Sequence, residues 1–259
     1  MSEVAADQVY TVARRSVVRT IRQPANVVFP LVFPLLLLAV NAGGLDAATK
    51  LPGFPTSSYL AFALAIPFIQ GALFATMNAG TDLARDIQTG FLNRLSLTPM
   101  RGVALLAGQL GGIAVMGVAQ AVVYLTVGLI VGVRLESGPA GALVLLAFAL
   151  LISIAFGALG AFAALRTGSG EAVQSLFPVF FVFLFLSSMA LPRNLIEVDW
   201  FRAVATANPV SYLIECIRSL IITGWDGEAL ALGFGIATAT AVGAVFLANR
   251  ALRTRLARS

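Results

Sequence analysis

Long apolar runs alternate with short charged segments along the whole chain. Six windows contain no charged residue, and each reaches the roughly 20 residues that an α-helix needs to cross a bilayer. These windows are 23–45, 51–81, 102–133, 137–165, 172–192 and 229–249. The pattern predicts an all-α, polytopic membrane protein with a single transmembrane domain over residues 1–259. Its six transmembrane helices are expected at about 25–44, 57–79, 104–132, 140–165, 171–191 and 229–249.

The segment between the second and third windows is charged but keeps a helical repeat. Its charges run from Asp82 to Arg101, and because a charge in hydrocarbon costs at least a few kcal/mol, the segment is expected outside the bilayer. Pro99 ends the helix, since the residue before a proline is disfavoured in the α conformation. We therefore expect an amphipathic helix at about 82–98, which either packs on its own chain or docks a soluble partner. Its apolar stripe would be Leu83, Ile87, Phe91, Leu92 and Leu95.

The first predicted span follows an arginine-rich helix candidate at 8–22. Apolar residues, including Tyr10 and Ile21, line one of its faces and arginines line another, as in helices that lie in the headgroup plane. A signal peptide is the alternative, but the apolar run that follows is too long for one. The span itself contains Pro30 and Pro34. Each proline frees a backbone carbonyl, so neighbouring helices are expected to supply hydrogen-bond donors.

Residues 192–228 carry eight charges, and their longest charge-free run, 203–214, is too short to span a membrane. Asn208 can cap a helix and Pro209 suits its first position. Glu215 and Arg218 stand three residues apart and could form an ion pair. We expect an external helical hairpin at about 192–224, on or partly in the outer leaflet.

Charge sets the orientation and limits the function classes. Charged residues make up 11% of the chain, against about 25% in soluble domains. Of 17 Lys and Arg residues, twelve fall on the side that carries both termini and the 82–98 segment. The positive-inside rule places that side in the cytoplasm. The arginines are divided among loops, which argues against a nucleic-acid partner.

The sequence lacks the residues that several kinds of chemistry require. The chain has no histidine and one cysteine, so no catalytic residue or metal site is expected. Lys50 is the only lysine and follows no glycine-rich loop, so the nucleotide-binding loop G-x-x-x-x-G-K-[ST] is absent. The six windows hold no ionisable residue and the chain shows no doubled repeat, which disfavours an ion-coupled transporter.

Residues 86–99 and 208–218 each carry a motif that resembles type-2 ABC exporter permeases. That family carries an acidic cluster and then G-T-L-E-x-L-L-x-T-P between its second and third spans. Asp86 stands where the acidic cluster starts, whereas Asn93 replaces the usual acid, and Ile87 and Gln88 depart from the cluster. The D-x-x-x-G-x-x-x-R form, which includes Arg94, is similar to the daunorubicin-resistance-type permeases. The residues that match in register are Gly90, Leu92, Leu95, Thr98 and Pro99.

The second resemblance lies in the external segment. The family shows N-P, a hydrophobic residue, [ST]-Y, then an acid and an arginine. Here these residues are Asn208, Pro209, Val210, Ser211, Tyr212, Glu215 and Arg218. The resemblance implies a re-entrant helical hairpin between spans five and six that helps to close the external end of a transport path.

The resemblance also implies partners and a function. The 82–98 segment would be the coupling helix that seats on an ABC ATPase, with Asp82, Arg85 and Asp86 added to the matched residues. Two ATPase copies would bind ATP and Mg, a second permease copy would complete a dimer, and this chain would be neither an enzyme nor a cofactor binder by itself. The expected function is export of a hydrophobic or amphipathic drug or lipid across a bacterial inner membrane. Alternatives are a lipid-linked polysaccharide permease and a non-transporting membrane scaffold of the same fold.

Candidate path residues lie inside the spans. Gln70 either faces a pathway or bonds to a neighbouring helix. Phe177, Phe180 and Phe181 belong to the phenylalanine-dense fifth span. They either line a path for an apolar substrate or face lipid.

Overall fold

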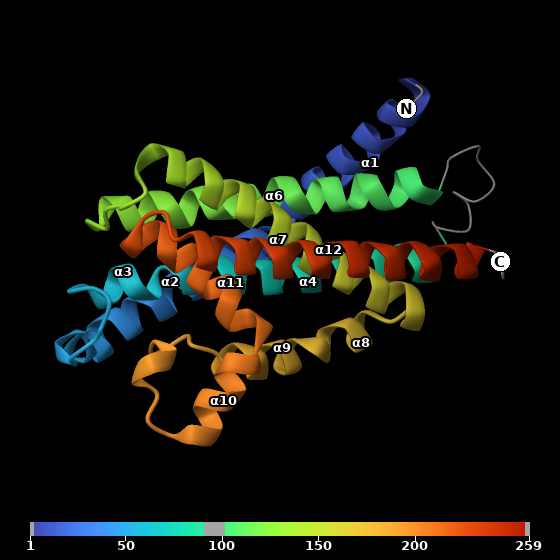
Figure 1. Ribbon diagram of the computed structural model, residues 1–259. Helices are drawn as coiled ribbons and strands as arrows, with labels where there is room; N and C mark the ends of the chain where they lie inside the picture. Colours follow the sequence, from blue (N-terminus) through green and yellow to red (C-terminus); the bar gives the residue numbers. More distant parts are fainter. Residues whose placement is uncertain (1–2, 91–101, 257–259) are drawn as a thin grey trace.

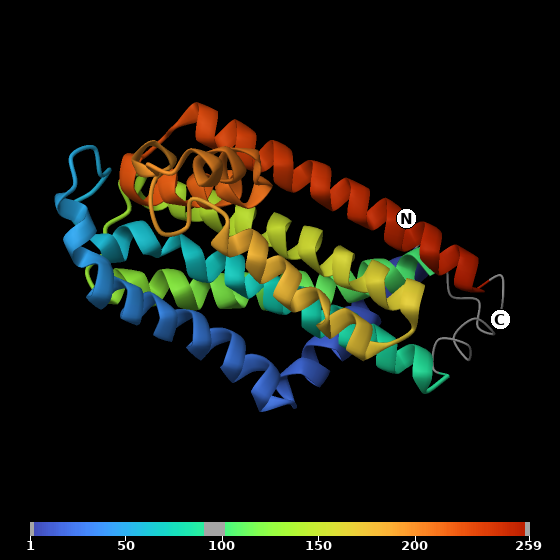
Figure 2. The ribbon, with the colours of Figure 1, turned by 90° about the horizontal axis from the view of Figure 1, so that it is seen from below.

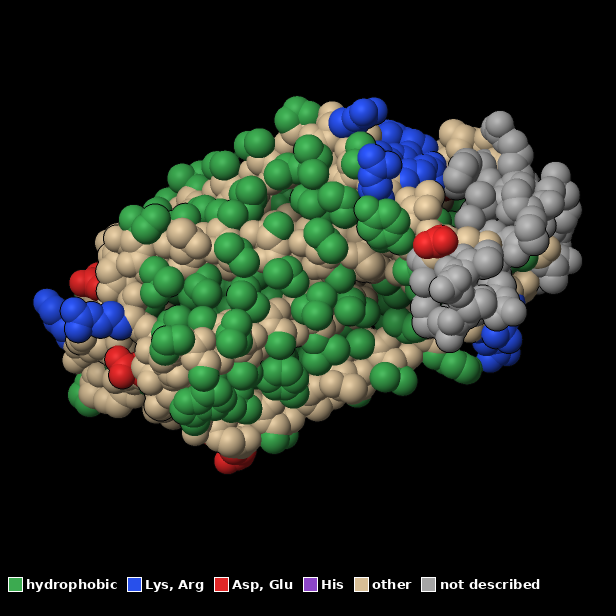
Figure 3. Space-filling model, turned by 90° about the horizontal axis from the view of Figure 1, so that it is seen from above, with side chains coloured by type: hydrophobic (Ala, Val, Ile, Leu, Met, Phe, Trp, Pro, Cys, Tyr) green, Lys and Arg blue, Asp and Glu red, His purple; other side chains and the backbone are tan. Residues whose placement is uncertain are grey.

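The computed structural model describes residues 3–90 and 102–256, and every regular element in these ranges is helical (Figure 1). Five of the described helical segments are long and apolar enough to cross a membrane. They are α2 (Pro24–Leu45), the α3–α4 pair (Tyr59–Ala63 and Ala65–Gln88), α6 (Gly102–Ile130), α7 (Gly138–Thr167) and α12 (Gly227–Leu256). Apolar side chains cover the middle of the face in Figure 3, and charged ones lie towards its ends. The predicted all-α polytopic membrane fold is confirmed.

Helix α4 forms the centre of the bundle. In the span that it makes with α3, 94% of the most apolar window is buried, against 17% for α2 and 22% for α12. It crosses α7 closely because both helices have a glycine at the contact. A β-carbon on Gly160 would lie 2.1 Å from the carbonyl oxygen of Thr76, and one on Gly80 would lie 2.8 Å from the carbonyl oxygen of Gly160.

The prolines of α2 are compensated by its neighbours, as the sequence predicts. Pro30 leaves the carbonyl of Asn26 without its helical donor, and Asn78 of α4 donates to that oxygen at 3.3 Å. Pro34 does the same to the carbonyl of Pro30, which accepts from the Tyr124 hydroxyl of α6 at 2.5 Å. These two bonds let α2 remain one helix and fix it against α4 and α6.

Helix α1 (Glu3–Ile21) lies against α6. Gly108 and Gly112, four residues apart on α6, leave room for Val12 and Ser16 of α1. The spacing is the G-x-x-x-G pattern that permits close helix contact in membranes. The apolar side chains of Tyr10 and Ile21 stay 69% and 60% exposed. Part of the apolar face expected of this helix is therefore left uncovered by the described chain.

The fifth predicted span differs from its expected form. Instead of one helix at 171–191, the structure has α8 (Gly170–Gln174) and α9 (Leu176–Phe185), separated at Ser175. Pro178 explains the break, because it cannot donate to the carbonyl of Gln174. The 16 residues of Gly170–Phe185 would extend about 24 Å, less than the roughly 30 Å of a bilayer core. Ser169 caps α8 by accepting from Ala172 N–H.

A helical hairpin follows α9 and turns back into the bundle. A short turn, η2 (Arg193–Leu195), leads into α10 (Asp199–Ala207), which lies outside the bundle in Figure 1. Helix α11 (Pro209–Arg218) and the π-helical turn η3 (Ser219–Thr223) return towards α12, and α11 packs on both α12 and α4. Another short turn, η1 (Asp46–Lys50), follows α2 at the same end of the molecule.

Candidate functional site

The predicted coupling segment begins inside a membrane helix. Helix α4 runs without a break to Gln88, so Asp82, Arg85 and Asp86 lie on its last turns and not on a separate helix. The expected start of the amphipathic helix at 82 is therefore corrected. The buried side chains of Leu83 and Ala84 continue the apolar side of α4, which is why the helix does not stop at the first charge. The predicted docking residues after Gly90 lie outside the described residues. They are Leu92, Arg94, Leu95, Thr98 and Pro99.

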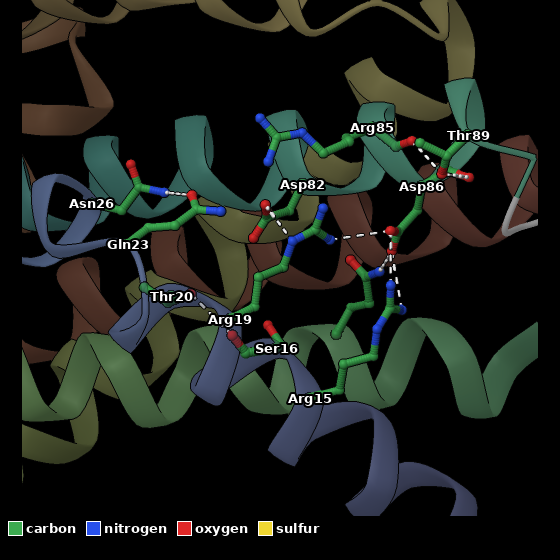
Figure 4. Close-up of polar contacts among 11 residues, drawn as sticks. Arg15, Ser16, Arg19, Thr20, Gln23, Asn26, Asp82, Arg85, Asp86 and Thr89 are labelled. Carbon is green, nitrogen blue, oxygen red and sulfur yellow. Dashed lines mark hydrogen bonds and ion pairs between the residues drawn. The ribbon is translucent and has the colours of Figure 1, made fainter.

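Two aspartates at the end of α4 face two arginines of α1 (Figure 4). Asp86 is only 3% exposed and accepts from Arg15 at 3.0 and 3.3 Å and from Arg19 at 3.1 Å. Asp82 pairs with Arg19 at 3.3 Å. Gln109 of α6 also donates to Asp86, at 3.5 Å. These five residues are called the α1–α4 ion-pair cluster below.

The spacing of the charges explains how the cluster forms. Arg15 and Arg19 are four residues apart, as are Asp82 and Asp86, so each pair lies on one face of its helix. The close approach of α1 to α6 brings those two faces together. The sequence pattern predicts these arginines in the headgroup plane, whereas in the structure two of them pair with the aspartates of α4. The matched spacing was the signal that could have revealed this pairing.

The cluster changes which predicted docking residues are free to dock. Asp82 and Asp86 are engaged within the chain, so they do not form an open acidic surface. Arg85 is exposed and its side chain points away from the cluster. Gly90 adopts a positive φ of 68°, a conformation that favours glycine, and this residue turns the chain as α4 ends.

We expect Asp86→Asn to destabilise the chain by about 1–3 kcal/mol, because the part-buried Arg15 and Arg19 lose the carboxylate that they share. The matched control is Asp199→Asn on α10, whose side chain is 89% exposed and pairs only with Arg202 in the described part of the chain. Exposed pairs contribute little, so the control should unfold like the wild type. Thermal unfolding of the purified protein measures the difference, and equal midpoints for the two variants would contradict the role of the cluster.

A second polar network lies at the opposite end, around Arg218. This arginine is 5% exposed and donates to the carbonyls of Phe62, Ser188 and Met189, each at 3.1 Å. Its guanidinium also lies over the ring of Phe62, 3.4 Å from the ring centre. One side chain thereby joins α3, the turn after α9, and α11.

The predicted Glu215–Arg218 ion pair is wrong in this structure. Glu215 instead pairs with Arg193 and accepts from Ser188 Oγ at 3.0 Å. Arg218 already has three carbonyl acceptors, whereas Arg193 reaches Glu215 from η2. Neither Arg193 nor Ser188 stood out in the sequence, because both lie more than 20 residues away from Glu215.

The predicted caps and turns of the hairpin are present. Asn208 accepts from Val210 N–H, and its amide donates to the carbonyls of Phe183 and Leu186 at the end of α9. Pro209 occupies the first position of α11. The Tyr212 hydroxyl donates to the carbonyl of Thr206 at 2.8 Å. The hairpin is thus tied both to itself and to α9.

Aromatic rings form a continuous row across α2, α4 and α9. Successive ring centres are 4.5–6.1 Å apart in pairs that connect Phe33, Phe29, Phe74, Phe177, Phe181 and Phe185. Two of the candidate path residues, Phe177 and Phe181, belong to this row. Phe180 packs instead on Phe156 of α7, at 5.8 Å. Gln70 is 2% exposed and its side-chain oxygen has no hydrogen-bond partner among the described residues, so the expected helix–helix bond is not made through that atom.

Comparison with known proteins gives consistent matches. The family model described as ABC-2 type transporter matches residues 7–222. The chain is 31% identical over 201 residues to the daunorubicin resistance ABC transporter permease protein of Streptomyces coeruleorubidus, a match that covers 75% of this chain and 66% of the relative. It is 24% identical over 218 residues to a putative transport permease of Cyanophora paradoxa, covering 82% of this chain and 73% of that protein. The chain therefore spans slightly less than two thirds of the first relative.

Proposed function

Since the chain belongs to the ABC-2 type transporter family, we propose that it is the membrane permease of an ATP-driven exporter of hydrophobic or amphipathic molecules. It would lie in a bacterial inner membrane with both termini in the cytoplasm. The first turns of α1 and the last turns of α12 lie at the same end of the molecule (Figures 1 and 2), which is compatible with this topology.

The energy source would be an ABC ATPase on a separate chain. The sequence lacks a nucleotide-binding loop, so ATP and Mg would be bound by two ATPase copies, and two permease copies would complete the assembly. The observation that carries the proposal is the continuity of α4. This central helix leads directly from the buried core to the predicted docking segment, and it holds α1 through the ion-pair cluster. A displacement at its cytoplasmic end would therefore reach both the core and α1.

The aromatic row supports the proposed substrate class. Phe29 and Phe185 are 54% and 57% exposed, and a row of rings offers stacking and apolar contact but no charge. Such a surface suits an apolar or amphipathic molecule, and the daunorubicin resistance for which the Streptomyces relative is named is compatible with that class. Export of a drug or lipid is accordingly favoured over export of a sugar polymer.

Co-purification with a co-expressed ABC ATPase tests the proposal. We expect Leu92→Asp/Leu95→Asp to abolish co-purification, since it places two charges in the apolar stripe predicted to seat on the ATPase. The control, Val198→Asp/Trp225→Asp, adds the same charge at exposed positions, 53% and 57% exposed, at the other end of the molecule. Equal recovery of ATPase with both double variants would show that the docking surface is misplaced, and absence of ATPase from the wild type would favour a scaffold.

A further inference from the structure

Helix α1 and the residue that follows it carry four arginines, of which two are paired within the described chain. Arg15 and Arg19 pair with Asp82 and Asp86 in the ion-pair cluster. Arg14 and Arg22 are exposed, and neither side chain has a hydrogen bond or ion pair within residues 3–90 and 102–256. Two arginines without a partner among the described residues therefore remain, Arg14 on α1 and Arg22 directly after it.

These arginines border an open groove of about 710 Å³ on α1. All four arginines of α1 and the corner that follows it line the groove, together with Thr11, Val18 and Gln23. The hydroxyl of Thr11 and the amide of Gln23 add neutral hydrogen-bond donors beside the guanidinium groups. Figure 3 shows basic side chains gathered on the face that carries α1. The groove thus suits a compact anion with several oxygen acceptors.

The apolar side chains beside the arginines of α1 indicate what kind of molecule carries the anion. Tyr10 and Ile21 leave large apolar side chains exposed next to the arginine face. A helix with an apolar face beside a basic one lies at the boundary between acyl chains and headgroups. An occupant of the groove would therefore have its charged group at headgroup level and its apolar part beside Tyr10 and Ile21.

We propose that the α1 groove binds the phosphate of an anionic phospholipid in the leaflet where α1 lies. Arg14 and Arg22 bind the phosphate oxygens, while Arg15 and Arg19 keep their aspartate partners. The lipid thereby fixes the helix that holds the end of α4. Binding concerns the permease chain alone, so it holds or fails independently of ATPase docking.

Native mass spectrometry of the detergent-purified full chain tests the site. The probes are phosphatidylglycerol, phosphatidylcholine and the soluble headgroup glycerol phosphate. One arginine near an anionic lipid surface contributes about fivefold in affinity. We therefore expect Arg14→Gln/Arg22→Gln to weaken phosphatidylglycerol binding by about 25-fold and to leave phosphatidylcholine binding unchanged.

The control variant is Arg250→Gln/Arg253→Gln. It removes the same charge from exposed residues near the end of α12 and should keep phosphatidylglycerol binding. The proposal is overturned if the wild type binds the two lipids equally, or if both double variants lose affinity to the same extent, which would indicate diffuse attraction. If glycerol phosphate displaced phosphatidylglycerol when both are present at the same concentration, the groove would be a site for free phosphate, and the proposal of a lipid ligand would be wrong. Unfolding midpoints of both variants equal to that of the wild type would verify that neither change disrupts the fold.

Discussion

Arg218→Met should destabilise the protein by about 3 kcal/mol or more, because two buried carbonyls and one part-buried carbonyl each lose a donor at a cost of about 1–3 kcal/mol. Those carbonyls belong to Phe62, Ser188 and Met189, and methionine fills a similar volume without donating. Since they belong to separate elements, the change should also release α11 from α3 and from the turn after α9. Thermal unfolding in detergent measures the loss, which corresponds to a fall in midpoint of about 10 °C or more.

Two further variants make this result specific. Arg202→Met removes an arginine from the exposed α10, where its only partner within the described ranges is the exposed Asp199, and should change the midpoint little. Arg218→Lys keeps the charge but lacks the planar fork that reaches three acceptors, so its midpoint should fall between the other two. If Arg218→Met unfolded like Arg202→Met, the three hydrogen bonds would not stabilise the hairpin.

Gly160→Ala should also be strongly destabilising, even though alanine favours helices by about 1 kcal/mol over glycine. The added β-carbon would lie 2.1 Å from the carbonyl oxygen of Thr76. Because the neighbour is backbone, rotation of a side chain cannot relieve the clash, and α4 and α7 must separate. Overpacking of this kind costs about 1–3 kcal/mol or more, and the separation would also lengthen the 2.9 Å hydrogen bond from Thr76 to the carbonyl of Phe156.

The control is Gly243→Ala on α12, where an added β-carbon meets nothing within 4 Å. This variant should have an unchanged or slightly higher unfolding midpoint, since only the helix preference of alanine operates there. Comparing the two alanine variants isolates the packing effect from the propensity effect. A midpoint for Gly160→Ala equal to that of Gly243→Ala would show that α4 and α7 do not cross as closely as described.

Local features of the chain were predictable from the sequence. Charge-free windows of sufficient length predicted the five long membrane helices, and Ser169 and Asn208 cap the helices that follow them. Pro30 and Pro34 predicted a need for outside donors without indicating which residues donate. Each of these features depends on residues within a few turns, where the period of the helix fixes which groups are neighbours.

Only the tertiary structure decided which distant groups meet. Glu215 has Arg218 nearby in sequence but pairs with Arg193, and Asp86 binds arginines about 70 residues earlier in the chain. Gly160 looks like any membrane-helix glycine until its distance from Thr76 is known. A sequence pattern gives the face on which a side chain lies, whereas its partner depends on how helices cross and slide. Crossing is set by packing over the whole bundle, and no short segment contains that information.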